Sequence, residues 1–393
     1  MSRAIIAARA LRGFADGAVS VVLPSYLLAL GLSKFEVGAV ATSTLLGSAL
    51  LTLIVGLLSA RFAPQRVLLV ACALMAGTGL GFAGFSGFAA LMVVAFVGTL
   101  NPTAGDVSVF LPTEQALLAQ AGDGTQRIAT FARYNVAGAL LGAFGSLAAG
   151  LPDLAVKHFG VDPAPALRTV FLVYACTALP LVALYRGLGP EAGAPRAAAG
   201  RAAPLAKSRG VVLKLSALFS LDSFGGGFAV QSLLALWLHA RFGLSLAALG
   251  TFFFAASTLS AFSQFMSARL AARIGMIQTM VFTHLPANAL LVAAAFMPTA
   301  PLALACLLAR GALSQMDVPA RQSFVMSVVP PEERAAAAGV TNVPRSLASA
   351  ASPLLAGALL EHSSTGWPLV CAGVAKIVYD LLLLWQFRRV QPG

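Results

Sequence analysis

The sequence repeats itself at a spacing of about 207 residues, and this repeat limits the folds open to the chain. At that spacing the segment Leu111–Ala116 aligns with Val318–Ser323, and at 210 to 212 residues Gly31-Leu32-Ser33 aligns with Gly243-Leu244-Ser245. The chain therefore consists of two related halves. Two membrane-embedded halves related by an axis along the membrane normal form an architecture with a substrate site between them, near the middle of the bilayer.

The apolar segments predict an all-α polytopic membrane protein. Hydrophobic residues make up 59% of the chain and charged residues only 10%, against about 25% charged in soluble domains. Because a stretch of about 20 apolar residues spans a bilayer as a helix, we predict twelve transmembrane helices in two pseudo-symmetric six-helix bundles. The expected spans are 4–30, 36–60, 67–86, 88–119, 128–150, 168–186, 211–238, 246–268, 277–297, 301–328, 335–358 and 367–387. The first has no small-residue cleavage site, so we expect it to be retained as a helix and not removed as a signal peptide.

The expected domains are 1–186, a cytoplasmic linker 187–210 rich in Gly, Pro and Ala, and 211–393. The net charge of +12 reflects topology. About 15 of the 26 Lys and Arg fall in loops on one side of the predicted membrane and about four on the other, which places both termini and the linker in the cytoplasm. We therefore expect no nucleic-acid partner, and contacts with membrane lipids instead.

Catalytic and cofactor motifs are not indicated by the sequence. The four Cys lie far apart inside predicted helices, so neither a disulfide framework nor a metal site is expected. A phosphate-binding loop of the G-x-x-x-x-G-K-[ST] type does not occur. We expect a monomer that is not an enzyme, has no cofactor, and draws its energy from an ion or substrate gradient.

The loop between the second and third spans carries a family resemblance. The segment reads Gly56-Leu57-Leu58-Ser59-Ala60-Arg61-Phe62-Ala63-Pro64-Gln65-Arg66. As a whole it resembles the G-x-L-A-D-R-x-G-R-R/K signature of the major facilitator superfamily. The Asp of that signature is Ala60 here, and the echo of the loop around Arg273 also has no Asp. The resemblance covers essentially the whole chain and is nearest in character to bacterial drug and metabolite exporters. It implies transport by alternating access, and neither loop of this chain supplies the Asp that joins the family's cytoplasmic charge network.

Charges inside the predicted spans are the candidate functional groups. A charge at the bilayer centre costs about 2.5–3.5 kcal/mol on insertion scales, so each needs a partner, water or a function. Of 13 such residues, nine fall on the first, fourth, seventh and tenth spans, which line the central cavity in the resembled fold. These nine are Arg9, Arg12, Asp16, Asp106, Glu114, Asp222, Arg310, Asp317 and Arg321. The expected substrate- and proton-binding set is Arg12, Asp16, Asp106, Asp222, Gln231, Arg310 and Asp317.

The repeat inverts the sign of two of these charges, because Glu114 aligns with Arg321 and Arg12 with Asp222. Opposite signs at symmetry-related positions predict a Glu114–Arg321 salt bridge between the halves, which would close the cytoplasmic mouth. Asn135 and Asn342 are expected to contribute gate contacts. The alternative is that each charge is neutralised within its own half, for example Arg321 by Asp317 four residues earlier.

Asp16, Asp106 and Asp222 are the candidate proton carriers, since burial opposes the ionised form of a carboxylate. The alternative is a permanently ionised carboxylate that is paired with an Arg. We expect Lys376 and Asp380 to form a structural i,i+4 pair, and His284 to have a lipid-side or packing role.

The favoured function is that of a secondary transporter in the bacterial inner membrane, acting as a proton-coupled antiporter in the efflux of a small organic or amphiphilic solute. An importer of a metabolite anion or a metal remains an alternative. A non-transporting receptor on the same fold is a second one.

Overall fold

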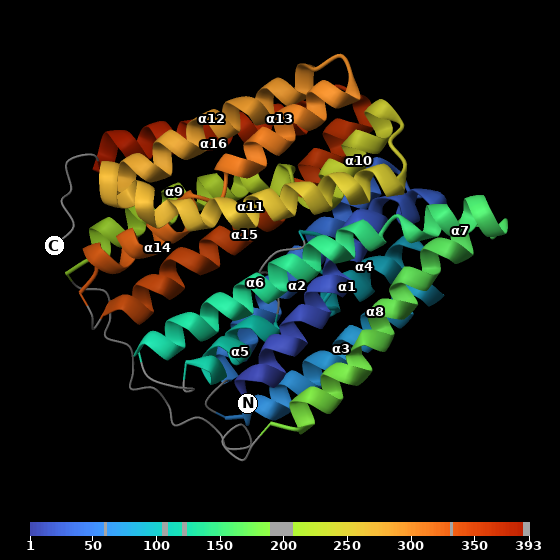
Figure 1. Cartoon of the computed structure of the whole chain (residues 1–393), viewed down its shortest axis with the longest axis horizontal. Helices are drawn as coiled ribbons and strands as arrows, with labels where there is room; N and C mark the ends of the chain where they lie inside the picture. Colours follow the sequence, from blue (N-terminus) through green and yellow to red (C-terminus); the bar gives the residue numbers. More distant parts are fainter. Residues whose placement is uncertain (59–60, 104–108, 120–123, 189–206, 331–332, 388–393) are drawn as a thin grey trace. The chain divides into compact units, whose positions relative to one another are not determined.

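The computed structural model describes residues 1–58, 61–103, 109–119, 124–188, 207–330 and 333–387, which form helices joined by turns (Figure 1). The first eight helices are α1 Ser2–Ala29, α2 Lys34–Leu58, α3 Pro64–Gly84, α4 Phe88–Val97, α5 Phe110–Leu118, α6 Gly124–Ala148, α7 Leu151–Phe159 and α8 Pro163–Arg186. The other eight are α9 Arg209–Phe228, α10 Gln231–Phe242, α11 Leu246–Ile274, α12 Met276–Phe296, α13 Ala300–Leu313, α14 Asp317–Val328, α15 Arg334–His362 and α16 Trp367–Phe387.

Every predicted span coincides with one helix or with two consecutive helices. Nine segments of the described residues are long and apolar enough to cross a membrane by length and composition. The other three predicted spans are α1, which carries Arg9, Arg12 and Asp16, and two of the three spans that are divided into two helices, α4 with α5 and α13 with α14. The spans that depart from simple hydropathy are thus among those that carry the intramembrane charges.

The chain forms two compact units. Unit 1 comprises Met1–Ala199 and Gln231–Phe254, and unit 2 comprises Gly200–Val230 and Ala255–Gly393. The backbone passes between them at the break between α9 and α10 and again within α11. One change of unit, at 199/200, falls within the expected linker 187–210, and the division also assigns Gln231–Phe254 to unit 1, where α10 packs against α1 and α2. Most of that expected linker, 189–206, lies outside the described residues.

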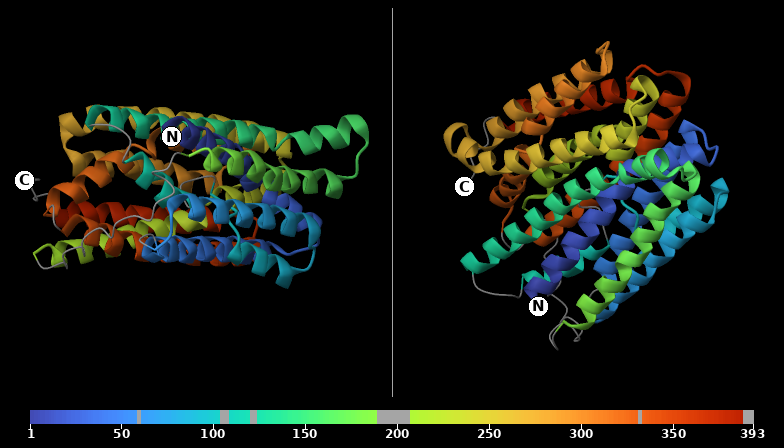
Figure 2. Two further views of the ribbon diagram at one scale, coloured as in Figure 1. Left: turned by 90° about the horizontal axis from the view of Figure 1, so that it is seen from below. Right: turned by 45° about the vertical axis from the view of Figure 1, so that its right-hand side comes forward.

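Within each unit the same helix packing recurs (Figure 2). In unit 1, α1 packs along α6 and α8, and α3 packs along α8. In unit 2, α9 packs along α15 and α16, and α12 packs along α16. The first, third, fifth and sixth spans of each half therefore make equivalent contacts, as the sequence repeat predicts.

Glycines bring α1 and α6 into close contact. A Cβ atom on Gly13 would lie 2.5 Å from the Gly138 carbonyl oxygen, and one on Gly17 would lie 2.0 Å from that of Gly142. Small residues spaced four apart allow such backbone approach between membrane helices. This contact fixes α1, which carries the charges of unit 1, against α6.

The aligned Gly-Leu-Ser segments form the same turn. Gly31 follows α1 with a φ of 86°, and Gly243 follows α10 with a φ of 66°, a left-handed conformation that favours glycine. The next Ser caps the following helix in both cases: the amide of Glu36 donates to Ser33 Oγ at 3.2 Å, and that of Ala248 donates to Ser245 Oγ at 3.2 Å.

Candidate functional site

Unit 1 buries an ion pair between its first and fourth spans. Arg12 Nη2 on α1 donates to Glu114 Oε2 on α5, and the two residues are 2% and 0% exposed. Two phenols satisfy the same carboxylate: the Tyr134 hydroxyl donates to Oε2 at 2.7 Å, and the Tyr185 hydroxyl donates to Oε1 at 2.5 Å. We call Arg12, Glu114, Tyr134 and Tyr185 the unit 1 cluster. The Glu114 carboxylate accepts from one cation and two neutral hydroxyls, so it is both neutralised and hydrogen-bonded.

Asp16 lies one turn along α1 from Arg12 and is also buried. It interacts electrostatically with Arg12 and Arg9. Its carboxylate forms no hydrogen bond or ion pair with any other residue that the structure describes. Arg12 directs Nη2 to Glu114 and not to Asp16, so Asp16 stays a candidate proton carrier, as the sequence predicts.

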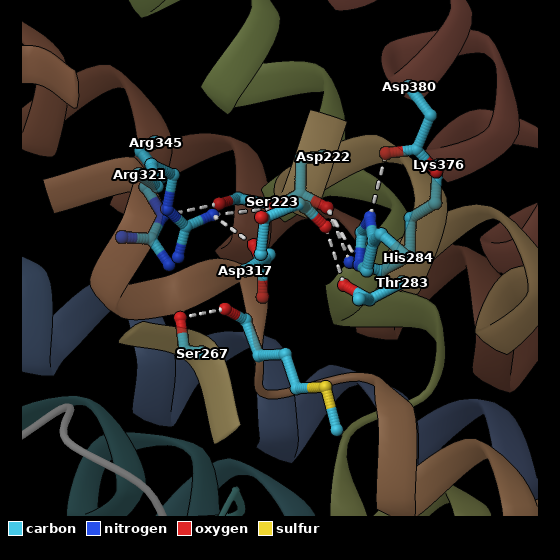
Figure 3. A network of polar contacts seen from close by, with 12 residues as sticks. Asp222, Ser223, Ser267, Thr283, His284, Asp317, Arg321, Arg345, Lys376 and Asp380 are labelled. Carbon is cyan, nitrogen blue, oxygen red and sulfur yellow. Dashed lines mark hydrogen bonds and ion pairs between the residues drawn. The ribbon is translucent and has the colours of Figure 1, made fainter. Parts of the chain in front are cut away.

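Unit 2 buries a carboxylate with two cations (Figure 3). Asp222 on α9 receives Lys376 Nζ of α16 on Oδ1 at 2.6 Å and Arg321 Nη1 of α14 on Oδ2 at 3.1 Å. Arg321 Nη1 also lies 3.6 Å from Asp317 Oδ2, four residues earlier on α14. Lys376 reaches Asp222 because α9 has glycines where α16 crosses it: a Cβ on Gly225 would lie 3.0 Å from Lys376 Cγ.

His284 on α12 connects Asp222 to a second buried carboxylate. Its Nδ1 lies 2.9 Å from Asp380 Oδ1, and its Nε2 lies 3.9 Å from Asp222 Oδ1. Asn288 Nδ2 donates to Asp380 Oδ2 at 2.9 Å. We call Asp222, Arg321, Lys376, His284 and Asp380 the unit 2 cluster; all five side chains are buried.

The sign inversion seen in the sequence corresponds to one ion pair inside each unit. The first and fourth spans pair as Arg12 with Glu114 in unit 1, and as Asp222 with Arg321 in unit 2. Both Glu114 and Arg321 therefore have partners in their own units, which is the alternative to a pair between the halves. The Glu114–Arg321 gate stays a prediction. Asn135 and Asn342 are exposed on their units.

The family follows from the comparisons with known proteins. The sequence profile of the Major Facilitator Superfamily matches residues 5–353. The chain belongs to this superfamily. It is a secondary transporter and not an enzyme, and the predicted all-helical polytopic fold is confirmed by the match to the superfamily's structures over nearly the full length.

Relatives of this superfamily member share its fold at low identity. The yeast (Saccharomyces cerevisiae) "Uncharacterized membrane protein YJR124C" is 24% identical over 96% of this chain and 92% of its own length. A bacterial homologue of the iron transporter ferroportin, in an inward-facing state, superposes with a TM-score of 0.76 at 16% identity, covering 98% of both chains. The nucleoside transporter NupG gives a TM-score of 0.72 at 16% identity, covering 98% of this chain and 99% of that one.

The remaining predicted residues of this transporter are distributed over both units. Gln231 Nε2 donates to Ser146 Oγ at 3.0 Å within unit 1. Arg310 on α13 is half-buried and interacts electrostatically with Asp222. Asp106 lies outside the described residues.

One sequence prediction is wrong, and of the lipid-side or packing role expected of His284 the lipid-side half is wrong; both concern groups that the superfamily resemblance gave little weight. Lys376 does not pair with Asp380; it binds Asp222, because α16 faces α9. His284 is buried against Asp380 and Asp222 and does not face lipid. The sequence repeat could have drawn attention to His284. At the 212-residue spacing that aligns Arg61 with Arg273, His284 aligns with Cys72 on α3. Tyr134 and Tyr185 were missed because phenols are ordinary in apolar helices.

Proposed function

We propose that this superfamily member is a proton-coupled exporter of a small organic or amphiphilic solute, working by alternating access in the bacterial inner membrane with both termini in the cytoplasm. The observation that carries the proposal is the burial of acid–base groups deep within the membrane helices of each unit. Intramembrane ionisable residues are costly and mark ion or proton pathways by default.

The depth of these groups supports this interpretation. His284 is the ninth residue of the 21-residue helix α12, and Asp380 is the fourteenth of the 21 residues of α16. At 1.5 Å per residue, His284 lies about 12 Å from the start of its helix, and the hydrocarbon core of a bilayer is about 30 Å thick. These groups are thus far from bulk water by either end of the helix. The export direction is supported by the sequence resemblance to drug and metabolite exporters.

Everted membrane vesicles test both the coupling and the direction. Respiration acidifies the vesicle lumen and quenches acridine orange, and candidate solutes are then added outside, on the cytoplasmic face. The panel contains nucleosides, pentoses and organic anions, which are the solute classes named for three of the similar solved structures, and amphiphilic cations, which represent the proposed amphiphilic solutes. An antiporter exchanges its solute for luminal protons, so fluorescence recovers with at least one compound in vesicles that contain the protein and not in empty controls. A receptor would leave the gradient unchanged with every compound.

Import of a metabolite anion is the second candidate, and the charge balance of unit 2 favours it. Four cations (Arg310, Arg321, Arg345 and Lys376) surround three carboxylates (Asp222, Asp317 and Asp380). Arg310 forms no hydrogen bond or ion pair with the other described residues, and Arg345 Nε donates to Ser223 Oγ at 2.8 Å. A proton symporter for an anion would not dissipate the gradient in everted vesicles, but would accumulate organic anions in right-side-out vesicles.

A further inference from the structure

We infer that His284 is the group of unit 2 that takes up and releases the coupled proton, at Nε2, between the carboxylates of Asp222 and Asp380. The inference rests on the proton coupling proposed above and assigns the site at which the proton binds.

The hydrogen bonds of the imidazole set its tautomer. Nδ1 lies 2.9 Å from Asp380 Oδ1 and 3.3 Å from Asn288 Nδ2; because the shorter contact is to an acceptor, we assign the hydrogen of the neutral ring to Nδ1. Asn288 donates to the other oxygen of the same carboxylate and fixes its orientation. The lone pair of Nε2 is therefore free and faces Asp222 Oδ1 at 3.9 Å. In the neutral state these two acceptors have no hydrogen between them, and the distance is longer than a hydrogen bond.

Protonation changes this contact. A proton from water forms a bond with the Nε2 lone pair, and the resulting N–H can donate to Asp222 Oδ1. Lys376 already holds that oxygen at 2.6 Å, and Arg321 holds Oδ2 at 3.1 Å. When a third cation binds a single carboxylate, the ion pairs of that carboxylate with the other two cations become weaker. Proton binding at His284 therefore competes with Lys376 and Arg321 for Asp222, and release of the proton restores both pairs.

Histidine is the side chain that proteins most often use for proton uptake and release near neutral pH, and His284 is the histidine of the unit 2 cluster. The titratable and charged groups facing the cluster from neighbouring helices are Asp222 on α9, Arg310 on α13, Asp317 and Arg321 on α14, Arg345 on α15, and Lys376, Tyr379 and Asp380 on α16. The carboxylates are held by cations or by His284 and Asn288. The Tyr379 ring packs edge-on to the imidazole, with centroids 6.1 Å apart.

The repeat supplies an independent argument. Cys72 occupies the position equivalent to His284 and lies close enough to Arg12 and Glu114 to interact with them electrostatically. The described part of α8, the sixth span of unit 1, has no acidic residue, whereas α16 has Asp380. Each unit has an ion pair between its first and fourth spans, and in unit 2 an imidazole and a second carboxylate lie beside this pair.

Nitrogen NMR of the protein in lipid nanodiscs tests the inference without a known solute. The chain has four His, and with ¹⁵N-labelled imidazoles the His284 signals are identified by their loss in His284→Gln. If that variant does not fold, His284→Cys, which copies Cys72, replaces it. Between about pH 8 and pH 5, Nε2 of His284 is expected to pass from the unprotonated to the protonated state, while Nδ1 stays protonated. In Asp380→Asn the neutral ring is expected to lose its single tautomer.

Several results would overturn the assignment. One is a His284 ring that keeps one protonation state over this range, and another is a titration unchanged by both Asp380→Asn and Asp222→Asn. In the vesicle assay, His284→Gln should abolish recovery of acridine orange fluorescence with the panel compound that gives the largest wild-type response, and leave exchange of that compound intact. His362→Gln, in an exposed His of the same unit, is the matched control. Retained recovery in His284→Gln refutes the site, whereas absence of recovery in wild type refutes the proposed coupling and leaves the NMR result to stand alone.

Discussion

The two units stabilise equivalent buried ion pairs with different side chains. Each buries an Arg–carboxylate pair between its first and fourth spans, with the polarity exchanged. In unit 1 the remaining acceptors of Glu114 are filled by the phenols of Tyr134 and Tyr185, which do not change charge near neutral pH. In unit 2 Asp222 receives Lys376 besides Arg321, and His284 Nε2 lies 3.9 Å from the same carboxylate. Unit 1 thus has a saturated pair, and unit 2 has a pair whose balance depends on an imidazole.

This difference indicates a division of labour within an otherwise repeated architecture. Breaking one partner of a buried pair leaves an uncompensated charge, which typically costs about 3–5 kcal/mol. The phenol hydrogen bonds keep Glu114 paired with Arg12, whereas Asp222 has two cations and can pair with either. We expect unit 1 to be the rigid member of the two and unit 2 the one that responds to protons.

Removing the charge of Asp222 should have the largest effect. Asp222→Asn leaves Arg321 with Asp317 and leaves Lys376 buried without an ion pair to the other described residues, so the free energy of unfolding should fall by about 3–5 kcal/mol. Unfolding in detergent measures the loss. The control is Asp162→Asn, an exposed carboxylate at the start of α8 with no side-chain cap hydrogen bond. Adding Lys376→Gln should recover part of the stability, and equal stability of Asp222→Asn and the control would contradict the role of Asp222.

The polarity of the unit 1 pair should be exchangeable, at an intermediate cost. Arg12→Gln and Glu114→Gln should each destabilise the protein by about 3 kcal/mol or more. The swap Arg12→Glu with Glu114→Arg should recover part of this loss, since unit 2 already uses that polarity. The recovery remains partial because Tyr134 and Tyr185 would then face a guanidinium, which has no acceptor for their hydroxyls.

A second cycle addresses the predicted gate. If Glu114 acts through Arg12 alone, Glu114→Gln and Arg321→Gln should have additive effects, and Glu114→Arg with Arg321→Glu should rescue nothing. Spin labels on the fourth and tenth spans report the distance across the cytoplasmic mouth. Non-additive effects of Glu114→Arg and Arg321→Glu on this distance would support a Glu114–Arg321 gate instead.

The sequence predicted the twelve spans and the repeat, because apolar length and turn chemistry are local properties. The aligned Gly31 and Gly243 turns show this directly, since both adopt the same left-handed conformation. Pairing was harder to predict. Arg12 had Asp16 one turn away in sequence but binds Glu114, and Lys376 had Asp380 one turn away but binds Asp222. A long side chain reaches whichever helix faces it, and the sequence spacing of one helix does not specify that neighbour.

Removing the phenol hydroxyls of unit 1 should have a smaller effect than removing its charges. Tyr185→Phe removes the donor that the structure shows on Glu114 Oε1, which typically costs about 1–3 kcal/mol, whereas Tyr134→Phe leaves Oε2 bound to Arg12 and should cost less. Thermal unfolding should show the loss in both variants. In Glu114→Gln the cost of Tyr185→Phe should shrink, because an amide needs the phenol less than a carboxylate does. An unchanged cost in that background would mean that Tyr185 acts through packing with Phe110, whose ring lies 6.2 Å away.

The smallest effect is expected at Cys72, and it bears most directly on the comparison. Cys72→Ala removes one buried sulfur atom, which is close in size to a methylene and corresponds to about 0.8 kcal/mol. It leaves the Arg12–Glu114 pair and both phenol contacts in place. Solute-driven recovery of acridine orange fluorescence should therefore keep its wild-type pH dependence in Cys72→Ala and lose it in His284→Ala, although the two substitutions occupy equivalent positions of the repeat. If Cys72→Ala changed that pH dependence as much as His284→Ala, both units would take part in proton binding and the division of labour would be wrong.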